Sequence, residues 1–126
     1  RISIALREIH AKPSHPWNLE ELAQLSGMSR TSFAVRFRDL VGVPPLTYVF
    51  NWRMRLAERE LSETDHSVAD IACSLGYGSE SAFSNAFSRA TGLSPGRFRK
   101  DAMQTSSERR RSVNRRAIDA EQTRSS

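Results

Sequence analysis

The sequence predicts an all-α protein built from two helix-turn-helix subdomains joined by a linker helix. Three observations predict this fold class. The sequence repeats once with a period near 50, each copy carries apolar residues at helical spacing, and no stretch shows the sustained alternation of a strand. Two copies are too few for a solenoid, and two copies of a helical unit are the simpler interpretation. With the helices before, between and after the units, we expect about seven helices, followed by a disordered C-terminal tail.

The repeat is clearest where each copy passes from one helix to the next. Residues 18–29 align with residues 67–79. The offset is 49 as far as Gly76 and 50 from Ser79 onward, so the second turn holds one extra residue. The matched pairs are Leu19 and Val68, Leu22 and Ile71, Ala23 and Ala72, Gly27 and Gly76, Phe33 and Phe83, Phe37 and Phe87, Gly42 and Gly92, and Pro45 and Pro95.

The first helix of each copy has a start signal and a stop signal. Asn18 and Ser67 are predicted N-caps, and an acidic residue three positions later, Glu21 or Asp70, is the expected reciprocal partner. A glycine follows each of these helices, where a positive φ is easiest for that residue. The two glycines are Gly27 and Gly76.

The second helix of each copy is predicted to begin after a capping serine, Ser29 or Ser79, and to end at Gly42 or Gly92. Each is expected to bury one face. The residues expected on the two buried faces are Phe33, Phe37, Leu40, Phe83, Phe87 and Ala90.

Three further helices complete the prediction. An N-terminal helix is expected over residues 2–11, and a short final helix over residues 94–100. The linker helix begins at a proline pair, which suits a first helical turn. The predicted organisation is a first subdomain at residues 1–44, a linker helix at 45–62, a second subdomain at 63–100 and a disordered basic tail at 101–126.

The tail differs from the rest in composition. It holds six arginines against four acidic residues and almost no large apolar side chain. The run Arg109-Arg110-Arg111 would add non-specific affinity for DNA, and an inert solvated end is the other reading.

The charge of the chain favours a polyanionic partner. The net charge is +5, and only two of the 19 basic residues are lysines. Arginine suits phosphate oxygens and base edges because its planar guanidinium donates two parallel hydrogen bonds.

A single cysteine forms no intrachain disulfide, which fits a reducing cytoplasm. No segment has the ~20 apolar residues of a membrane helix or the pattern of a signal peptide. The chain begins with Arg1 inside an amphipathic pattern, which suggests a fragment of a longer protein.

The repeated unit has the features that DNA reading requires. In a helix-turn-helix, the first helix braces the second, whose N-terminal residues meet base edges in the major groove. Ala23 and Ala72 are small where the two helices of each unit would cross. A linker helix of ~17 residues spans ~26 Å, comparable with the ~34 Å between successive major-groove openings on one face of DNA. Two ordinary helical hairpins packed together remain the alternative.

The residues also resemble the AraC/XylS family DNA-binding domain over about residues 1–100. The resemblance is carried by Ala23-x3-Gly27-Met-Ser29, by Phe37-x4-Gly42-x2-Pro45-x2-Tyr48, and by Ile71-Ala72-x3-Gly76-Tyr77-x-Ser79-x3-Phe83-x3-Phe87-x4-Gly92-x-Ser94-Pro95-x2-Phe98-Arg99. The resemblance implies seven helices, activation or repression of bacterial promoters through RNA polymerase, no cofactor, and an effector or dimerisation domain that this chain lacks.

The resemblance also implies which residues meet DNA. Base contacts are expected from Arg30, Thr31, Ala34, Val35, Glu80, Ser81 and Asn85. Phosphate contacts are expected from Ser29, Arg36, Arg38, Ser79, Arg89 and Arg99. Many members carry arginine where this chain has Val35 and Asn85. Valine can meet only a thymine methyl, whereas asparagine can bond adenine through two hydrogen bonds; a packing role for Val35 and a solvated role for Asn85 stay open.

Other chemistry has little support in the sequence. The three histidines are far apart, there is no phosphate-binding glycine loop after a strand, and Cys73 is expected to be packed rather than reactive. An enzyme or a metal site is therefore not expected. The second hypothesis is a helical protein-interaction module that contacts RNA polymerase or another regulator, with Tyr48, Phe50 and Trp52 as a contact stripe.

Overall fold

A computed structural model describes residues 1–124, with side chains described for residues 1–111. This part of the chain is helical and has no strand. The helices are α1 (Ile2–Ala11), α2 (Leu19–Leu25), α3 (Arg30–Val41), α4 (Pro45–Glu63), α5 (Val68–Ser74), α6 (Glu80–Thr91) and α7 (Pro95–Arg124). The predicted fold class is confirmed: two helix-turn-helix units, α2–α3 and α5–α6, are joined by α4.

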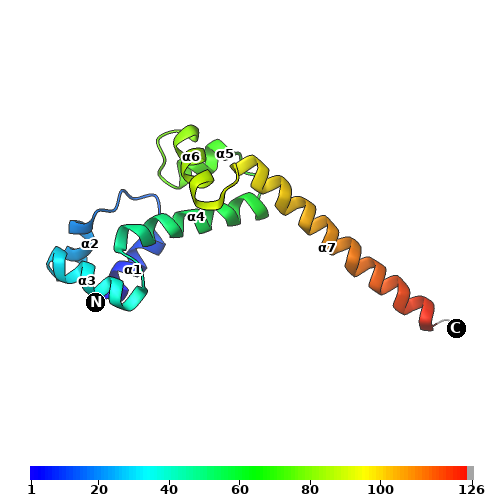
Figure 1. Ribbon diagram of the computed structural model, residues 1–126, viewed down its shortest axis with the longest axis horizontal. Coiled ribbons are helices and arrows are strands. Elements are labelled where there is room, and N and C mark those ends of the chain that lie inside the picture. The colour runs from blue at the N-terminus through cyan, green and yellow to red at the C-terminus, as the bar shows by residue number, and fades with distance from the viewer. Residues whose placement is uncertain (125–126) are drawn as a thin grey trace.

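Helix α4 connects the two units. Helices α1, α2 and α3 gather at its N-terminal end, and α5 and α6 lie against its C-terminal half (Figure 1). Proline at position 45 begins α4 because the first helical turn needs no N–H from that residue. The 19 residues of α4 extend over about 28 Å at 1.5 Å per residue.

Each unit has its own apolar core. The first core is built around two phenylalanines of α3, Phe33 and Phe37, which are fully buried against α1, α2 and the start of α4. The second is built around their repeats in α6, Phe83 and Phe87, and is completed by the second half of α4. The residues paired by the sequence repeat therefore occupy equivalent positions in the two cores.

Two residues expected in the cores lie outside them. Leu40 is 67% exposed, and Ala90 is exposed as well. Both occupy the last turn of their helix and face open hollows, Leu40 beside α1 and Ala90 beside α4. Val41 takes the core position at the end of α3 instead, while Leu40 lines a surface hollow with Met28.

The predicted caps and turns are present in both units. The side chains of Asn18 and Ser67 accept hydrogen bonds from the backbone N–H three residues on. Gly27 has φ +66° and Gly76 φ +87°, values that L-residues with a Cβ rarely adopt. The reciprocal half of the first cap differs from the prediction, because the Glu21 carboxylate binds His15 Nε2 at 2.7 Å instead.

The C-terminal segment differs from the sequence expectation. Helix α7 continues to Arg124, where a short helix and a disordered tail were expected. Its first turns pack against α4 and, through Phe98, against the second core, and the rest of the helix projects away from both units (Figure 1). The segment from Arg97 onward has no proline or glycine and many helix-favouring residues, so nothing in it stops the helix. Of the predicted tail, residues 125–126 lie outside the described residues.

Candidate nucleic-acid interface

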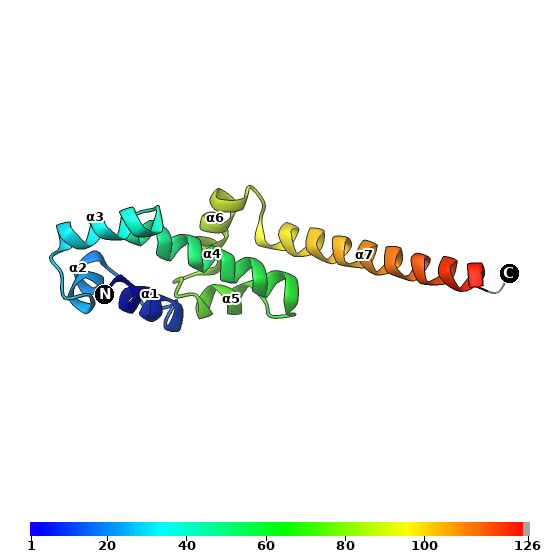
Figure 2. The ribbon, with the colours of Figure 1, turned by 90° about the horizontal axis from the view of Figure 1, so that it is seen from below.

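The second helices of the two units, α3 and α6, lie on the same side of the molecule. Figure 2 shows both along one edge, with α4 between them and α1 and α5 on the opposite side. The apolar face of each is buried in its own core, and the other face is solvent-exposed. In both units, therefore, the first helix supports the second, and the second exposes one face to solvent.

The N-termini of α3 and α6 are built alike and suit an anion. Ser29 Oγ accepts from Ser32 N–H at 3.3 Å, and Ser79 Oγ accepts from Ala82 N–H at 3.0 Å. A serine hydroxyl that accepts this bond can still donate its own proton to a phosphate oxygen. The first backbone N–H groups of a helix also lack partners within the helix and attract anions.

The residues predicted to meet bases occupy the exposed faces of these two helices. In α3, Arg30 and Thr31 are exposed, Val35 is 58% exposed and Ala34 is half-buried. A hollow of about 420 Å³ lies on this face, lined in part by Thr31 and Val35. Val35 is therefore not a packing residue, and the apolar surface it offers is accessible.

The corresponding face of α6 is more polar. Glu80, Ser81 and Asn85 are all exposed. The two faces thus differ in chemistry: α3 offers a methyl-rich surface around Val35, and α6 offers an amide, a hydroxyl and a carboxylate. If both faces meet DNA, they recognise base edges through different chemical groups.

Of the cations predicted to meet phosphate, three have exposed side chains on α3 or α6: Arg36, Arg38 and Arg89. Arg99 is different. It is half-buried, and its guanidinium donates to the backbone carbonyls of Leu61 at 3.1 Å, Thr64 at 3.3 Å and His66. The structure thus places Arg99 in the framework, where it holds the segment between α4 and α5.

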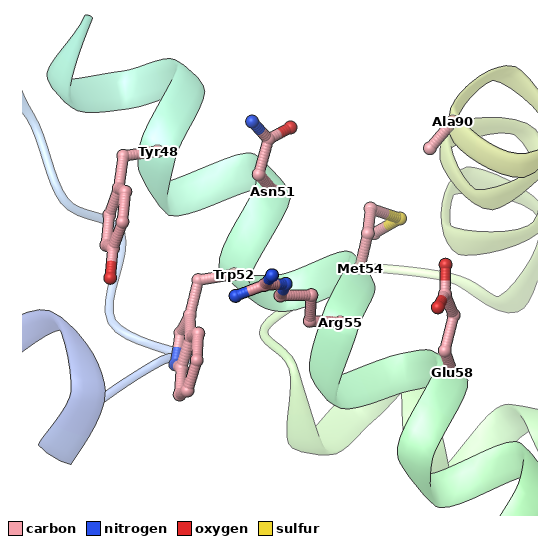
Figure 3. A pocket seen from close by; sticks show the side chains of 7 residues that line it. All are labelled: Tyr48, Asn51, Trp52, Met54, Arg55, Glu58 and Ala90. Carbon is pink, nitrogen blue, oxygen red and sulfur yellow. The ribbon is translucent and has the colours of Figure 1, made fainter. Parts of the chain in front are cut away.

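The aromatic stripe of α4 is divided between the two cores. Tyr48 and Trp52 pack against the first core, and Phe50 packs against the second. Tyr48 and Trp52 also border a pocket of about 370 Å³ on α4, whose other lining residues are Asn51, Met54, Arg55, Glu58 and Ala90 (Figure 3). Figure 3 shows Tyr48 and Trp52 leaving α4 on the side away from Ala90 of α6.

One residue missed by the sequence reasoning is Arg53. Its guanidinium donates to the carbonyls of Pro13 and His15, each at 2.7 Å, and so ties α4 to the segment between α1 and α2. Nothing in the local sequence marks this role, because the partners lie about 40 residues earlier.

Features of other functional classes are scarce in the described residues. No cluster of three or more histidine, cysteine or acidic side chains in that part of the chain has the arrangement of a metal site. No described helix is both long and apolar enough to cross a bilayer. Cys73 is exposed, so the expectation that it is packed was wrong.

Comparison with known proteins identifies the family. The family described as "Helix-turn-helix domain" matches residues 22–101. A protein of Streptomyces antibioticus named as an AraC-like transcription regulator is 45% identical over 102 residues, which cover 81% of this chain and 34% of that protein. The chain belongs to the AraC-type helix-turn-helix family.

Two further relatives are informative. The transcriptional regulator AlkR of Acinetobacter baylyi is 42% identical over 101 residues, covering 80% of this chain and 33% of AlkR. The crystal structure of the DNA-binding domain of AdpA, a global transcriptional factor, in complex with a target DNA has a TM-score of 0.74 and 31% identity. That alignment covers 79% of this chain and 90% of the AdpA domain.

The AraC-type chain described here spans about a third of the length of these curated relatives. Its family and fold are those of DNA-binding transcription regulators. The similarity to a domain solved on DNA, and the common side on which α3 and α6 lie, together define the candidate nucleic-acid interface.

Proposed function

We propose that this chain binds double-stranded DNA at specific sequences, as the DNA-binding part of a transcription regulator. The observation that carries this proposal is the repeated pair of capped, half-exposed helices, α3 and α6, on one side of α4 (Figure 2). The likeness to the AdpA domain in complex with its target DNA supports it.

In this proposal, residues 1–44 and residues 63–100 are two reading subdomains and α4 sets their separation. The length of α4, about 28 Å, is close to the ~34 Å between successive major-groove openings on one face of a duplex. Each subdomain then reads one short tract. Because the two units follow each other in the same chain direction, the site need not be palindromic.

Base recognition is assigned to the exposed residues of the two helices. Val35, with Thr31 beside it, suits a thymine methyl, since both present methyl groups and Val35 lacks a hydrogen-bonding atom. Asn85 suits adenine, whose N6 and N7 match the amide. The remaining proposed base contacts are Arg30, Ala34, Glu80 and Ser81.

Phosphate contacts are assigned to the helix N-termini and the exposed arginines. Ser29 and Ser79 donate their hydroxyl protons there, next to unpaired backbone N–H groups. Arg36, Arg38 and Arg89 supply the charge. We leave Arg99 out of this set because its Nε and Nη2 already donate to three backbone carbonyls.

The regulatory part of the proposal follows from the family. We propose that the bound protein activates or represses promoters by acting on RNA polymerase in the bacterial cytoplasm. The curated relatives are about three times as long as the matched region, so we also propose that an effector or dimerisation domain works together with it. No enzymatic step and no cofactor enter the proposal.

Selection from a random duplex library tests the proposal. Residues 1–126 are incubated with the library at two salt concentrations, and the retained DNA is sequenced. We expect a site with two tracts about ten base pairs apart. Asn85→Ala is expected to relax one tract only, by about 1–3 kcal/mol at one base pair, whereas Gln24→Ala on α2 leaves both tracts unchanged.

Other outcomes would overturn the proposal in different ways. Salt-sensitive binding with no enriched sequence would mean that α3 and α6 hold only phosphates. Binding to a protein partner that is insensitive to salt, with no binding to DNA, would favour the protein-interaction module.

A further inference from the structure

The second helix-turn-helix unit touches the first subdomain, residues 1–44, and this contact has no counterpart in the other copy of the repeat. The turn of the second unit, at Gly76, lies against the backbone of Ser14 in the segment between α1 and α2. A Cβ built on Gly76 would overlap the Ser14 carbonyl oxygen and stand 3.1 Å from Ser14 C and Cα. Carbon atoms in ordinary contact lie about 3.5–4.0 Å apart, so only the hydrogen of glycine fits there.

The segment on the other side of this contact is firmly held. Arg53 donates to the carbonyls on both sides of Ser14, those of Pro13 and His15, each at 2.7 Å. Trp17 Nε1 donates to the Lys12 carbonyl at 2.9 Å, which closes the segment on itself. Ser14 therefore presents a backbone surface that cannot easily retreat.

The charge of Arg53 also acts on the second unit. Burial raises the pKa of the Tyr77 phenol, and the charge of Arg53 lowers it in part, at the residue that follows Gly76. Tyr77 packs in turn against the second core, with its ring centroid 5.5 Å from that of Phe83. We call Ser14, Arg53, Gly76 and Tyr77 the junction.

The first unit offers a built-in comparison. Gly27 is the repeat of Gly76 and has a similar positive φ, +66° against +87°. A Cβ on Gly27 would meet nothing within 4 Å. The backbone requirement for glycine is therefore common to both turns, whereas the close approach to another unit is confined to Gly76.

We propose that the junction fixes the relative orientation of α3 and α6, and so sets the number of base pairs between the two tracts of a preferred site. This inference rests on the proposed function. Gly76 is four residues before the start of α6, and Ser14 is five residues before the start of α2, which braces α3. A displacement at the junction is thus transmitted directly to both reading helices. Gly76 and Arg53 are positioning residues that need not touch DNA.

The test compares Gly76→Ala with Gly27→Ala. Both variants acquire the same kind of backbone strain, but only Gly76→Ala forces the units apart. Affinity is measured for duplexes that carry the two selected tracts at spacings of about 8 to 13 base pairs, a range that brackets one helical turn. The readout is the ratio of affinities between the best spacing and its neighbours, which a general loss of stability does not change.

We expect the unmodified chain and Gly27→Ala to share one preferred spacing. Gly76→Ala is expected to shift that preference, or to lower its ratio by about tenfold. Arg53→Gln is expected to lower the ratio in the same direction, with Arg59→Gln, an exposed residue of the same helix, as its control. The same ratio in Gly76→Ala and Gly27→Ala, with no effect of Arg53→Gln, would overturn the inference.

A second measurement without DNA separates this inference from the proposed function. Spin labels are placed at two exposed positions, Gln24→Cys in α2 and Ala69→Cys in α5, in a Cys73→Ser background. The distance distribution between them is expected to shift or broaden with Gly76→Ala and to stay unchanged with Gly27→Ala. An unchanged distribution in both would overturn the role of the junction whether or not the chain binds DNA. Failure of the unmodified chain to bind any DNA, with the distance shift still present, would overturn the proposed function and the spacing role but not the role of the junction in orienting the two units.

Discussion

Arg99 either stabilises the fold or contacts DNA, and its replacement by glutamine tests which of the two roles it has. The guanidinium donates three hydrogen bonds to the carbonyls of Leu61, Thr64 and His66, which bind the end of α4 to the segment before α5. A hydrogen bond to a charged group contributes about 1.5–3 kcal/mol. Glutamine is shorter and cannot reach all three carbonyls, and the site is partly open to water.

We therefore expect Arg99→Gln to lower the free energy of unfolding by about 2–4 kcal/mol. For a chain of this size that corresponds to a fall in Tm of about 10 °C, measured by circular dichroism. Affinity for the selected duplex is then measured at several salt concentrations below the new Tm. A framework residue leaves the slope of log affinity against log salt unchanged, while a lost phosphate contact makes it shallower by about 0.9.

Arg89→Gln is the matched control, since Arg89 is exposed in the last turn of α6 and proposed to meet phosphate. It is expected to change stability by less than about 1 kcal/mol, the value of a cation at a helix C-terminus, and to make the salt slope shallower. The reverse result, a stable Arg99→Gln with a shallower slope, would refute the framework role and restore the phosphate contact.

Three further predictions follow from the cores, the caps and the turn. Phe37→Ala or Phe87→Ala is expected to cost about 3–5 kcal/mol, and hydrogen exchange should show the larger loss of protection in the unit that holds the substituted residue. Ser79→Ala removes the acceptor for Ala82 N–H and is expected to cost about 1 kcal/mol in chemical denaturation, with weaker binding of DNA as well. Because burial raises the pKa of Tyr77, the folded state holds its proton longer, so stability should fall as pH rises above 10, and Tyr77→Phe should reduce that fall.

The helices could be predicted because their signals are local. Apolar spacing, capping residues and glycines act within a few residues of one another, and the predicted N-terminal helix, residues 2–11, has the bounds of α1. The linker helix was predicted over residues 45–62 and ends one residue later. Leu40 was placed wrongly because periodicity gives the direction of a side chain but not whether a neighbouring helix extends far enough to cover it.

The framework contacts could not be predicted, since they join residues far apart in the sequence. Arg53 reaches carbonyls 38 and 40 residues earlier, and Arg99 reaches carbonyls 33 to 38 residues earlier. An arginine in an amphipathic helix has the same local pattern whether it meets water, phosphate or a backbone carbonyl. The family resemblance implied a phosphate contact for Arg99, and only the tertiary structure shows the three carbonyls that its guanidinium binds.

The two copies of the repeat are alike at positions that shape each unit and different at positions that join the units. Positions that shape a unit are kept: the serine caps, the positive-φ glycines and the paired phenylalanines have the same role in both. Positions that join the units differ, as when buried Val49 corresponds in the repeat to Arg99, which binds three carbonyls. Gly27 and Gly76 are identical in sequence yet only Gly76 abuts the other unit. A repeated sequence therefore specifies two similar readers, and the departures from repetition determine how those readers are held relative to each other.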